Sequence, residues 1–208
     1  MKERPILFSS PMVQAILAGR KTQTRRIVKI PAAVDSVTGV GFSAMTPDNM
    51  ASVRGFDKTD VHFETFIKIP YGEVGDRLWV RETWRKLPHN TSTGYPYEYR
   101  ATAEQDGIPI ESPWKPSIHM PRIASRITLE ITGIMVERLK DISEADAIAE
   151  GIERDKDGWK HYAPNTPADA LVGLPTPRES YRTLWESING QESWDSNPYV
   201  RVISFKKL

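Results

Sequence analysis

The sequence lacks cysteine, long apolar runs and an excess of charge of either sign. Without thiols, the chain has no disulfide, thiolate zinc site, iron–sulfur cluster or cysteine nucleophile. No apolar stretch approaches the roughly 20 residues that a membrane helix needs, so we expect no membrane span. The opening segment, MKERPILFSSPMVQ, carries charge but no sustained apolar run. We therefore expect no cleaved signal peptide and a cytoplasmic location.

Basic and acidic residues are nearly equal in number, but they are concentrated in different segments of the chain. Lysine and arginine total 28 and aspartate and glutamate 27, which gives a formal net charge of +1. This balance argues against a protein that coats long nucleic-acid duplexes, because such proteins carry a large positive excess. Five of the ten residues in 20–29 are basic, whereas acidic residues gather in 144–157. The four histidines are dispersed without metal-ligand spacing, so we predict neither a metal nor another cofactor.

The pattern of short elements indicates an α+β or small-barrel fold. Apolar or alternating segments predict strands at 6–8, 78–80, 125–136 and 199–205, with a further strand at 97–101. Three stretches with weak periodicity and many proline, glycine or polar residues are interpreted as insertions, at 31–74, 86–122 and 151–175. The first has room for one hairpin. Regular alternation of strands and helices is missing, which argues against a doubly wound fold.

Three helices are predicted from their start and stop signals. Ser10 and Pro11 open the first, and Gly19 ends it. Ser143 begins the second, with Asp146 three residues later in a variant of the capping box. The third begins at the group Thr176, Pro177 and Glu179 and closes at Gly190.

The basic segment 20–29, RKTQTRRIVK, follows the first helix directly, and we call it the basic elbow. Taken alone, its cations suit the C-terminal end of a helix dipole and a solvated strand edge. However, Gly19-x-Lys21-x-x-Thr24-x-Arg26 puts a glycine turn, an amine, a hydroxyl and a guanidinium together. This pattern resembles the signature of the ASCH domains, a PUA-like β-barrel superfamily associated with RNA.

The resemblance covers roughly 5–30, 75–84, 123–152 and 178–206. It implies a single ASCH-like domain over 1–208, a PUA-like small β-barrel flanked by short helices, with the three insertions as long loops. The strand Trp79-Val80-Arg81-Glu82-Thr83-Trp84 makes the chain most similar to the long ASCH proteins of bacteriophages and prophages.

Small bacterial ASCH proteins include N(4)-acetylcytidine amidohydrolases, whose activity is assigned to a lysine, a threonine and a glutamate. The resemblance implies that Lys21, Thr24 and Glu150 are the catalytic residues here. In those enzymes the glutamate follows a short segment that Leu139, Ile142, Ser143 and Glu144 match in this chain. Counting the same number of residues onward from this match gives Glu150. Without the resemblance, Glu150 reads as a solvated helix residue and Thr24 as an ordinary strand residue.

Two routes of amide hydrolysis remain open for these groups. In the first, Thr24 attacks or positions a water while Lys21, with a pKa lowered by burial and by Arg25 or Arg26, accepts the proton. In the second, Glu150 activates water and Lys21 stays charged as the partner of the oxyanion.

The remaining predicted site residues bind substrate or RNA. They are Arg20, Arg25, Arg26, Glu82 and Trp84. Glu82 has a structural alternative as the ion-pair partner of an elbow arginine. Trp84, beside Arg81 and Arg85, is predicted at the surface, whereas Trp79 is predicted in the core; exposed aromatic rings beside cations are typical of single-strand sites.

The sequence thus leaves three functions. The first is an amidohydrolase that deacetylates N(4)-acetylcytidine or a related acylated pyrimidine nucleoside. The second is a non-catalytic RNA-binding module whose partner is single-stranded RNA. The third is a metal-independent ribonuclease that uses lysine and glutamate as acid and base.

Overall fold

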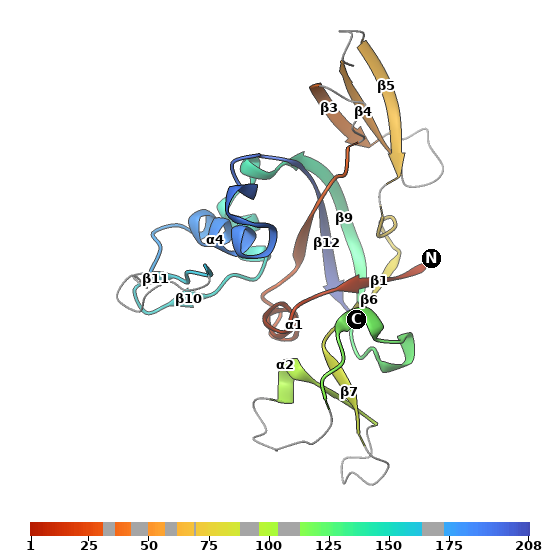
Figure 1. Cartoon of the computed structure of the whole chain (residues 1–208), viewed down its shortest axis with the longest axis vertical. Coiled ribbons are helices and arrows are strands. Elements are labelled where there is room, and N and C mark those ends of the chain that lie inside the picture. Colours follow the sequence, from red (N-terminus) through yellow and green to blue (C-terminus); the bar gives the residue numbers. More distant parts are fainter. Residues whose placement is uncertain are drawn as a thin grey trace.

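A five-stranded mixed sheet forms the centre of the protein, with strand order β1-β6-β9-β12-β2 (Figure 1). The structure, a computed structural model, describes residues 1–30, 36–42, 50–56, 62–68, 70–87, 96–103, 113–163 and 173–208. Only the β1–β6 pair is parallel; the other neighbours run antiparallel. The strands of this sheet are β1 (Glu3–Leu7), β6 (Arg77–Arg81), β9 (Thr128–Arg138), β12 (Tyr199–Lys207) and β2 (Gln23–Ile27).

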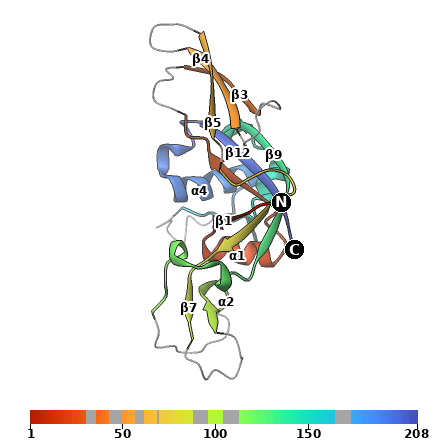
Figure 2. The same cartoon turned by 90° about the vertical axis from the view of Figure 1, so that its right-hand side faces the viewer.

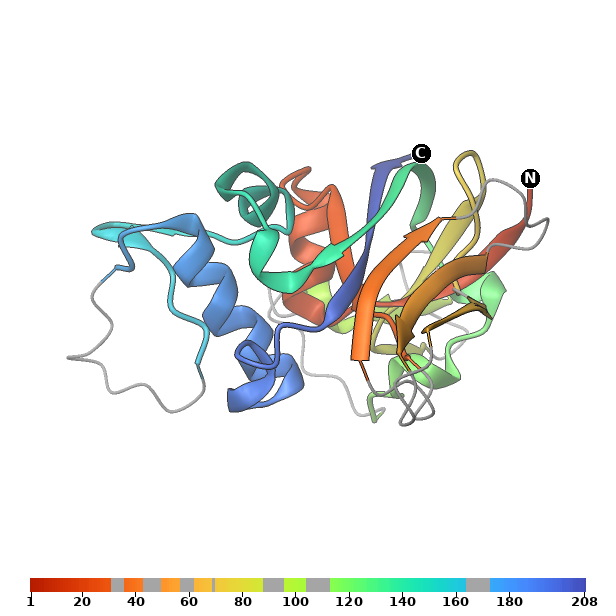
Figure 3. The ribbon, with the colours of Figure 1, turned by 90° about the horizontal axis from the view of Figure 1, so that it is seen from above.

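Each face of this sheet is covered by helices. The helices are α1 (Ser10–Leu17), α2 (Arg100–Ala103), α3 (Glu144–Ala149) and α4 (Pro177–Asn189). Val13 and Ile16 of α1 belong to the core on one face, and Tyr181 and Trp185 of α4 to the core on the other. Figure 3 shows α4 along one side of the sheet.

Strand β12 supplies both of these cores because side chains alternate between the faces of a strand. Ile203 and Phe205 pack with the α1 face, whereas Val200 and Val202 pack with the α3 and α4 face. The same alternation applies to β2, which pairs with β12 at the edge of the sheet. Consecutive residues of β2 therefore point to opposite sides of the edge, which determines the geometry of the site.

The predicted helix signals are largely confirmed. The Thr176 side chain and Glu179 form a full capping box at α4, and Gly190 ends that helix at φ +98°. The Ser143 hydroxyl accepts a hydrogen bond from the backbone N–H of Asp146 at the start of α3. One boundary differs: the N-cap of α1 is Ser9 rather than Ser10, without a side-chain capping bond.

The insertions contain more regular structure than their composition predicted. Within 31–74 the structure has a three-stranded antiparallel sheet instead of one hairpin: β3 (Ser36–Phe42), β4 (Met50–Phe56) and β5 (His62–Lys68). The predicted strand at 97–101 stops earlier, because β8 (Tyr97–Tyr99) runs directly into α2. Glycine and polar residues interspersed among the apolar ones made the composition of these segments resemble that of loops. The remaining strands are β7 (Trp84–Lys86), β10 (Arg154–Asp155) and β11 (Gly158–Trp159).

These additions lie away from one another around the central sheet. The β3–β5 sheet extends from one end of the molecule, and β7 with α2 lies at the other end (Figures 1 and 2). The hairpin of β10 and β11 follows α3 on the α4 side (Figure 1). The fold is therefore α+β. Among the described residues, no helix has the length and apolar character needed to cross a membrane.

Candidate functional site

The basic elbow joins α1 to β2 and is tied to the end of α3. Gly19 adopts φ +74° at the C-terminal end of α1, a conformation that glycine takes without steric cost. The backbone N–H of Lys21 then bonds to the Ala15 carbonyl at 3.1 Å, and that of Thr22 bonds to the Ala149 carbonyl at 2.8 Å. These bonds bring the elbow against Glu150, the residue that follows α3.

Lys21 and Glu150 form a buried ion pair. Lys21 Nζ donates to Glu150 Oε2 at 2.7 Å and to the Glu150 carbonyl oxygen at 2.8 Å. The Lys21 side chain has no exposed surface, and that of Glu150 is 4% exposed. Burial lowers the pKa of the Lys21 ammonium, with Arg26 and Arg25 adding to this effect and Glu150 opposing it.

A glycine makes this contact sterically possible. Gly151, at φ +91°, packs so closely that an added Cβ would lie 2.8 Å from the Lys21 Cβ and 3.0 Å from the Ala15 Cβ. Atoms of this kind do not approach so closely without displacement. The Glu150-Gly151 pair therefore combines the carboxylate with the only residue type that fits beside Lys21.

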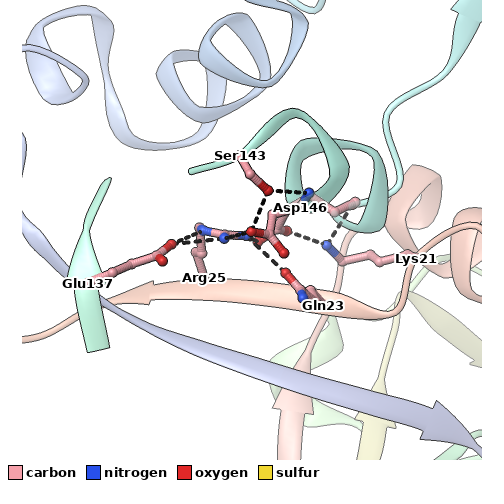
Figure 4. Close-up of polar contacts among 7 residues, drawn as sticks. Lys21, Gln23, Arg25, Glu137, Ser143 and Asp146 are labelled. Atoms are coloured by element: carbon pink, nitrogen blue, oxygen red, sulfur yellow. Dashed lines mark hydrogen bonds and ion pairs between the residues drawn. The ribbon is translucent and has the colours of Figure 1, made fainter. Parts of the chain in front are cut away.

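Arg25 sits at the centre of a group of carboxylates (Figure 4). Its Nε donates to Glu137 Oε1 at 2.9 Å, and its Nη1 donates to Glu150 Oε1 at 3.2 Å. Nη1 also reaches Gln23 Oε1 at 3.3 Å, while Nη2 lies 3.7 Å from Asp146 Oδ2. Arg25 thereby links β2, β9 and α3, and its charge is neutralised inside the protein.

Asp146 completes this arrangement from the first turn of α3. Partial burial by itself would raise the pKa of the Asp146 carboxyl. The hydrogen bonds from Ser143 and Gln23 and the positive charge of Arg25 together have a larger effect, so the pKa is lowered. The Ser143 hydroxyl donates to Asp146 Oδ2 at 2.7 Å (Figure 4). The helix cap predicted from sequence is thus also part of the polar cluster.

A cavity of about 840 Å³ opens beside this cluster, within the size range of small-molecule sites. Thr24, Arg25 and Glu150 lie on its wall. Because β2 is an edge strand, the cavity receives residues from both of its faces. Among the described residues, the other aromatic and basic side chains of its lining are Phe8, Tyr71, Tyr181, Trp185, Arg26, Lys29 and Arg201.

The structure therefore brings most of the predicted elbow and catalytic residues to one place. Thr24 and Glu150 line the cavity, and Lys21 lies behind Glu150. Arg26 lines the cavity too, with its Nη2 donating to the Leu7 carbonyl at 2.7 Å. Arg20 instead binds the Gly151 carbonyl at 3.1 Å and Glu153 at 2.9 Å, and it is not among the lining residues.

Glu82 and Trp84 lie elsewhere, and their surroundings differ from those predicted. Glu82 is buried and accepts two hydrogen bonds of 2.9 Å from Arg126, so its partner is not an elbow arginine. Trp84 is only 6% exposed and packs with Met120 and Ala124, so the surface position predicted for it is wrong. Neighbouring arginines in the sequence had suggested a solvated ring.

The core position predicted for Trp79 is also wrong, in the opposite direction. It is half-buried rather than a core residue, and the guanidinium carbons of Arg81 and Arg122 lie 5.4 Å and 5.9 Å from its ring centroid. Its flanking apolar residues, Leu78 and Val80, are the buried ones. Alternation along β6 explains this: the neighbours point into the core and Trp79 points away from it.

Sequence reasoning missed several members of the site. Glu137 and Gln23 bind Arg25 from β9 and β2, and Tyr181 reaches the cavity from α4. Their only signal was position: Glu137 lies next to the last residue of a long strand, and Tyr181 lies on the apolar side of a predicted helix. Among the described residues, His, Asp and Glu form no group of three that could hold a metal ion. No family model, curated protein or solved structure matches the chain.

Proposed function

We propose that this protein is an ASCH-type amidohydrolase that removes the acetyl group from N(4)-acetylcytidine or a related acylated pyrimidine nucleoside. The observation that carries the proposal is the contact between Lys21 and Glu150, 2.7 Å apart and buried beside the cavity that Thr24 lines. These three residues come from two distant segments of the chain. A chain without a functional site at this position would not require these three buried residues to lie together.

The proposed fold is a PUA-like barrel. Strands β1 and β2 are the two ends of the sheet order, yet Arg26 of β2 donates to the carbonyl of Leu7, the last residue of β1. A strongly curved sheet brings its edge strands together in this way. This contact supports a barrel and also puts the cavity at the join between the edges.

The lining favours Glu150 over Lys21 as the group that meets water. Glu150 and Thr24 line the cavity, whereas Lys21 is sealed behind Glu150. In the proposed reaction, a water held by Thr24 attacks the acetyl carbon while the Glu150 carboxylate takes one proton from it. The carbon–nitrogen bond then breaks, the exocyclic nitrogen receives that proton from Glu150, and the products are the free amine and acetic acid.

Lys21 acts on this step as a positioning residue. Its two bonds to Glu150 fix the carboxylate, and its positive charge stabilises the carboxylate between proton transfers. Arg25 holds the second carboxylate oxygen at 3.2 Å. Preorganised charges of this kind act strongly where water is excluded.

The rest of the cavity suits a pyrimidine. Phe8, Tyr181 and Trp185 lie on its wall and offer flat apolar surfaces against which a base packs. A long RNA strand would need a row of exposed cations to bind its phosphates. Arg25 cannot belong to such a row, because carboxylates enclose it and its side chain has no exposed surface. A small substrate is therefore favoured over a long single strand.

The test is direct conversion of N(4)-acetylcytidine by the purified protein, with release of cytidine followed by chromatography. We expect turnover that Lys21→Ala and Glu150→Ala each abolish and that Thr24→Val lowers on the order of 100-fold. Glu153→Gln is the matched control, because Glu153 is a nearby acid that pairs with Arg20 and Lys160 near the surface. Failure of the wild-type protein to exceed these variants would reject the hydrolase. Cleavage of labelled RNA in chelator would instead indicate the ribonuclease, and salt-dependent binding of RNA without turnover would indicate the binding module.

A further inference from the structure

The proposed reaction still needs a group that stabilises the negative charge formed on the acetyl oxygen. When water attacks the acetyl carbon, the electron pair of the carbon–oxygen double bond moves onto the oxygen, and a donor aimed at that oxygen lowers the barrier. Lys21 cannot be this donor, because its side chain has no exposed surface and its ammonium is bonded to Glu150. The Arg25 side chain is equally enclosed. The donor must therefore come from another part of the cavity wall.

Tyr181 offers a hydroxyl on this wall that has no partner. The residue belongs to α4, lines the cavity and is 3% exposed. Its hydroxyl makes no hydrogen bond to any residue that the structure describes. Within the same part of the chain, Trp185 Nε1 on the next turn of α4 is sealed off without a partner, but the Tyr181 hydroxyl is not. The small exposed surface of Tyr181 therefore includes its hydroxyl, which faces the cavity.

Tyr181 lies close to the carboxylate that is proposed to activate water. The guanidinium carbon of Arg25 is 6.0 Å from the centroid of the Tyr181 ring, and Arg25 Nη1 is 3.2 Å from Glu150 Oε1. Thr24 belongs to the other face of β2, because it pairs with Ile203 of the α1-side core and paired residues share a face. The cavity therefore has the Thr24 hydroxyl on one side of the sheet edge and Tyr181 on the other.

The surroundings of Tyr181 keep its hydroxyl protonated. Burial raises the pKa of this phenol well above its usual value, and Glu150 adds to the rise, whereas Arg25 and Arg26 oppose it. A group that donates a hydrogen bond must hold its proton. Because the phenol is neutral, it also does not draw the Glu150 carboxylate away from the cations that fix it.

We propose that Tyr181 is a further catalytic residue, whose hydroxyl donates a hydrogen bond to the acetyl oxygen of the substrate as that oxygen becomes negative. This inference rests on the proposed function. The phenol keeps its proton throughout. When the carbon–nitrogen bond breaks, the electron pair on the oxygen forms the double bond again, and the exocyclic nitrogen takes its proton from Glu150. The hydrogen bond is stronger to the negative oxygen than to the neutral carbonyl, so it raises kcat more than it tightens binding.

Steady-state kinetics of Tyr181→Phe with N(4)-acetylcytidine test this role. Phenylalanine keeps the ring that packs in the α4-side core and removes only the hydroxyl. We expect kcat to fall on the order of 100-fold. KM, and the affinity for cytidine measured by calorimetry, should stay within about threefold. The midpoint of urea denaturation should not change, because the hydroxyl has no protein partner to lose. A variant with wild-type kcat would overturn the proposal.

Tyr162→Phe is the matched control, because it removes a phenol hydroxyl that does have a partner. The Tyr162 hydroxyl accepts a hydrogen bond from the backbone N–H of Glu153 at 2.8 Å, and the ring packs against the same core without lining the cavity. We expect this variant to keep wild-type kcat and to lower the denaturation midpoint, the reverse of Tyr181→Phe. An equal loss of kcat in the two variants would attribute the effect to packing beside α4 and reject the catalytic role.

Arg26 is the rival donor, because it lines the cavity and lies two residues after Thr24 on the same face of β2. Its Nη2 is bonded to the Leu7 carbonyl, which directs part of the guanidinium away from the substrate. A loss of kcat in Arg26→Gln together with wild-type kcat in Tyr181→Phe would assign the oxygen to Arg26 and overturn the proposal.

A tetrahedral analogue separates this inference from the proposed function. In this analogue of N(4)-acetylcytidine a methylphosphonate replaces the acetyl group, so a negative oxygen stands where the acetyl oxygen becomes negative. We expect Tyr181→Phe to bind it about tenfold more weakly than the wild-type protein does. Such a difference without any turnover would reject the hydrolase and retain Tyr181 as the donor to this oxygen. Turnover by the wild-type protein with equal kcat and equal analogue binding in Tyr181→Phe would reject Tyr181 and retain the hydrolase.

Discussion

Lys21 Nζ lies 2.7 Å from Glu150 Oε2, although 129 residues separate the two in sequence. The pair connects the turn after α1 with the end of α3 and is closed to solvent. Removing two charges from water costs free energy that their attraction recovers only when further bonds satisfy them. Here the Glu150 carbonyl and Arg25 supply those bonds.

Breaking this pair from one side is expected to be costly. Lys21→Met leaves Glu150 buried with one cation fewer, and Glu150→Gln leaves the Lys21 ammonium without its carboxylate. Each is expected to lower the free energy of unfolding by about 3–5 kcal/mol in urea denaturation. The double variant is expected to lose less than the sum of the two, with a coupling energy of about 1–3 kcal/mol. Additive effects would show that the two residues do not interact in solution.

Gly151 gives a second test of how the elbow and α3 fit together. Gly151→Ala introduces a methyl group 2.8 Å from the Lys21 Cβ at φ +91°, so steric overlap adds to backbone strain. Gly19→Ala is the matched control, because φ is +74° there but nothing lies within 4 Å of the added Cβ. We expect about 1 kcal/mol of destabilisation for Gly19→Ala.

For Gly151→Ala we expect about 1–3 kcal/mol beyond the cost of Gly19→Ala, measured by the same denaturation experiment. Hydrolase activity should fall as well, because the displaced loop carries Glu150. Equal destabilisation by the two variants would mean that the close packing against Lys21 is absent.

Much of the fold was open to prediction from local patterns. The α4 capping box at Thr176, the Ser143 cap and the long alternating strand β9 are each encoded within a few neighbouring residues. Signals of this kind depend on hydrogen bonds and side-chain periodicity inside one segment. The three-stranded sheet β3–β5 was not predicted, because its strands lie in a segment whose composition is typical of loops.

The site was only partly predictable because its contacts are long-range. The elbow motif located Lys21 and Thr24, and the resemblance located Glu150, but no local pattern reveals that Glu137 meets Arg25. Nor does sequence show that an arginine is neutralised: Arg25 reads as a solvated cation yet is buried. Trp84 was misplaced for the same reason, since burial depends on which distant residues cover a ring.

The polar cluster around Arg25 predicts a specific response to acid. The folded-state pKa of Asp146 is lowered, so its ionised form stabilises the fold at pH values above the unfolded pKa of about 3.9. This contribution is lost as the pH falls through the folded value. We expect the stability difference between the wild-type protein and Asp146→Asn to be largest near pH 6 and to vanish well below pH 4.

Denaturation at a series of pH values measures that difference, with proton uptake on unfolding reduced in the variant by up to about one proton. Asp157→Asn, at an exposed position on the β10–β11 turn, controls for the removal of one carboxylate. A constant difference between wild type and Asp146→Asn from pH 6 to pH 3 would contradict the assigned contacts with Ser143, Gln23 and Arg25.

Thr24→Val separates the chemistry of the site from its packing. Valine keeps the branched shape of Thr24, which is 3% exposed, and the Thr24 hydroxyl makes no hydrogen bond to any residue that the structure describes. The free energy of unfolding is therefore expected to change by less than about 1.5 kcal/mol.

Turnover of the acetylated substrate by Thr24→Val is expected to fall on the order of 100-fold, because the water then lacks its positioning group. Since KM reports binding only when chemistry is slow, the affinity for cytidine is measured separately by calorimetry and should stay within about threefold. A variant that keeps wild-type kcat would exclude Thr24 from the reaction and leave Glu150 to hold the water alone.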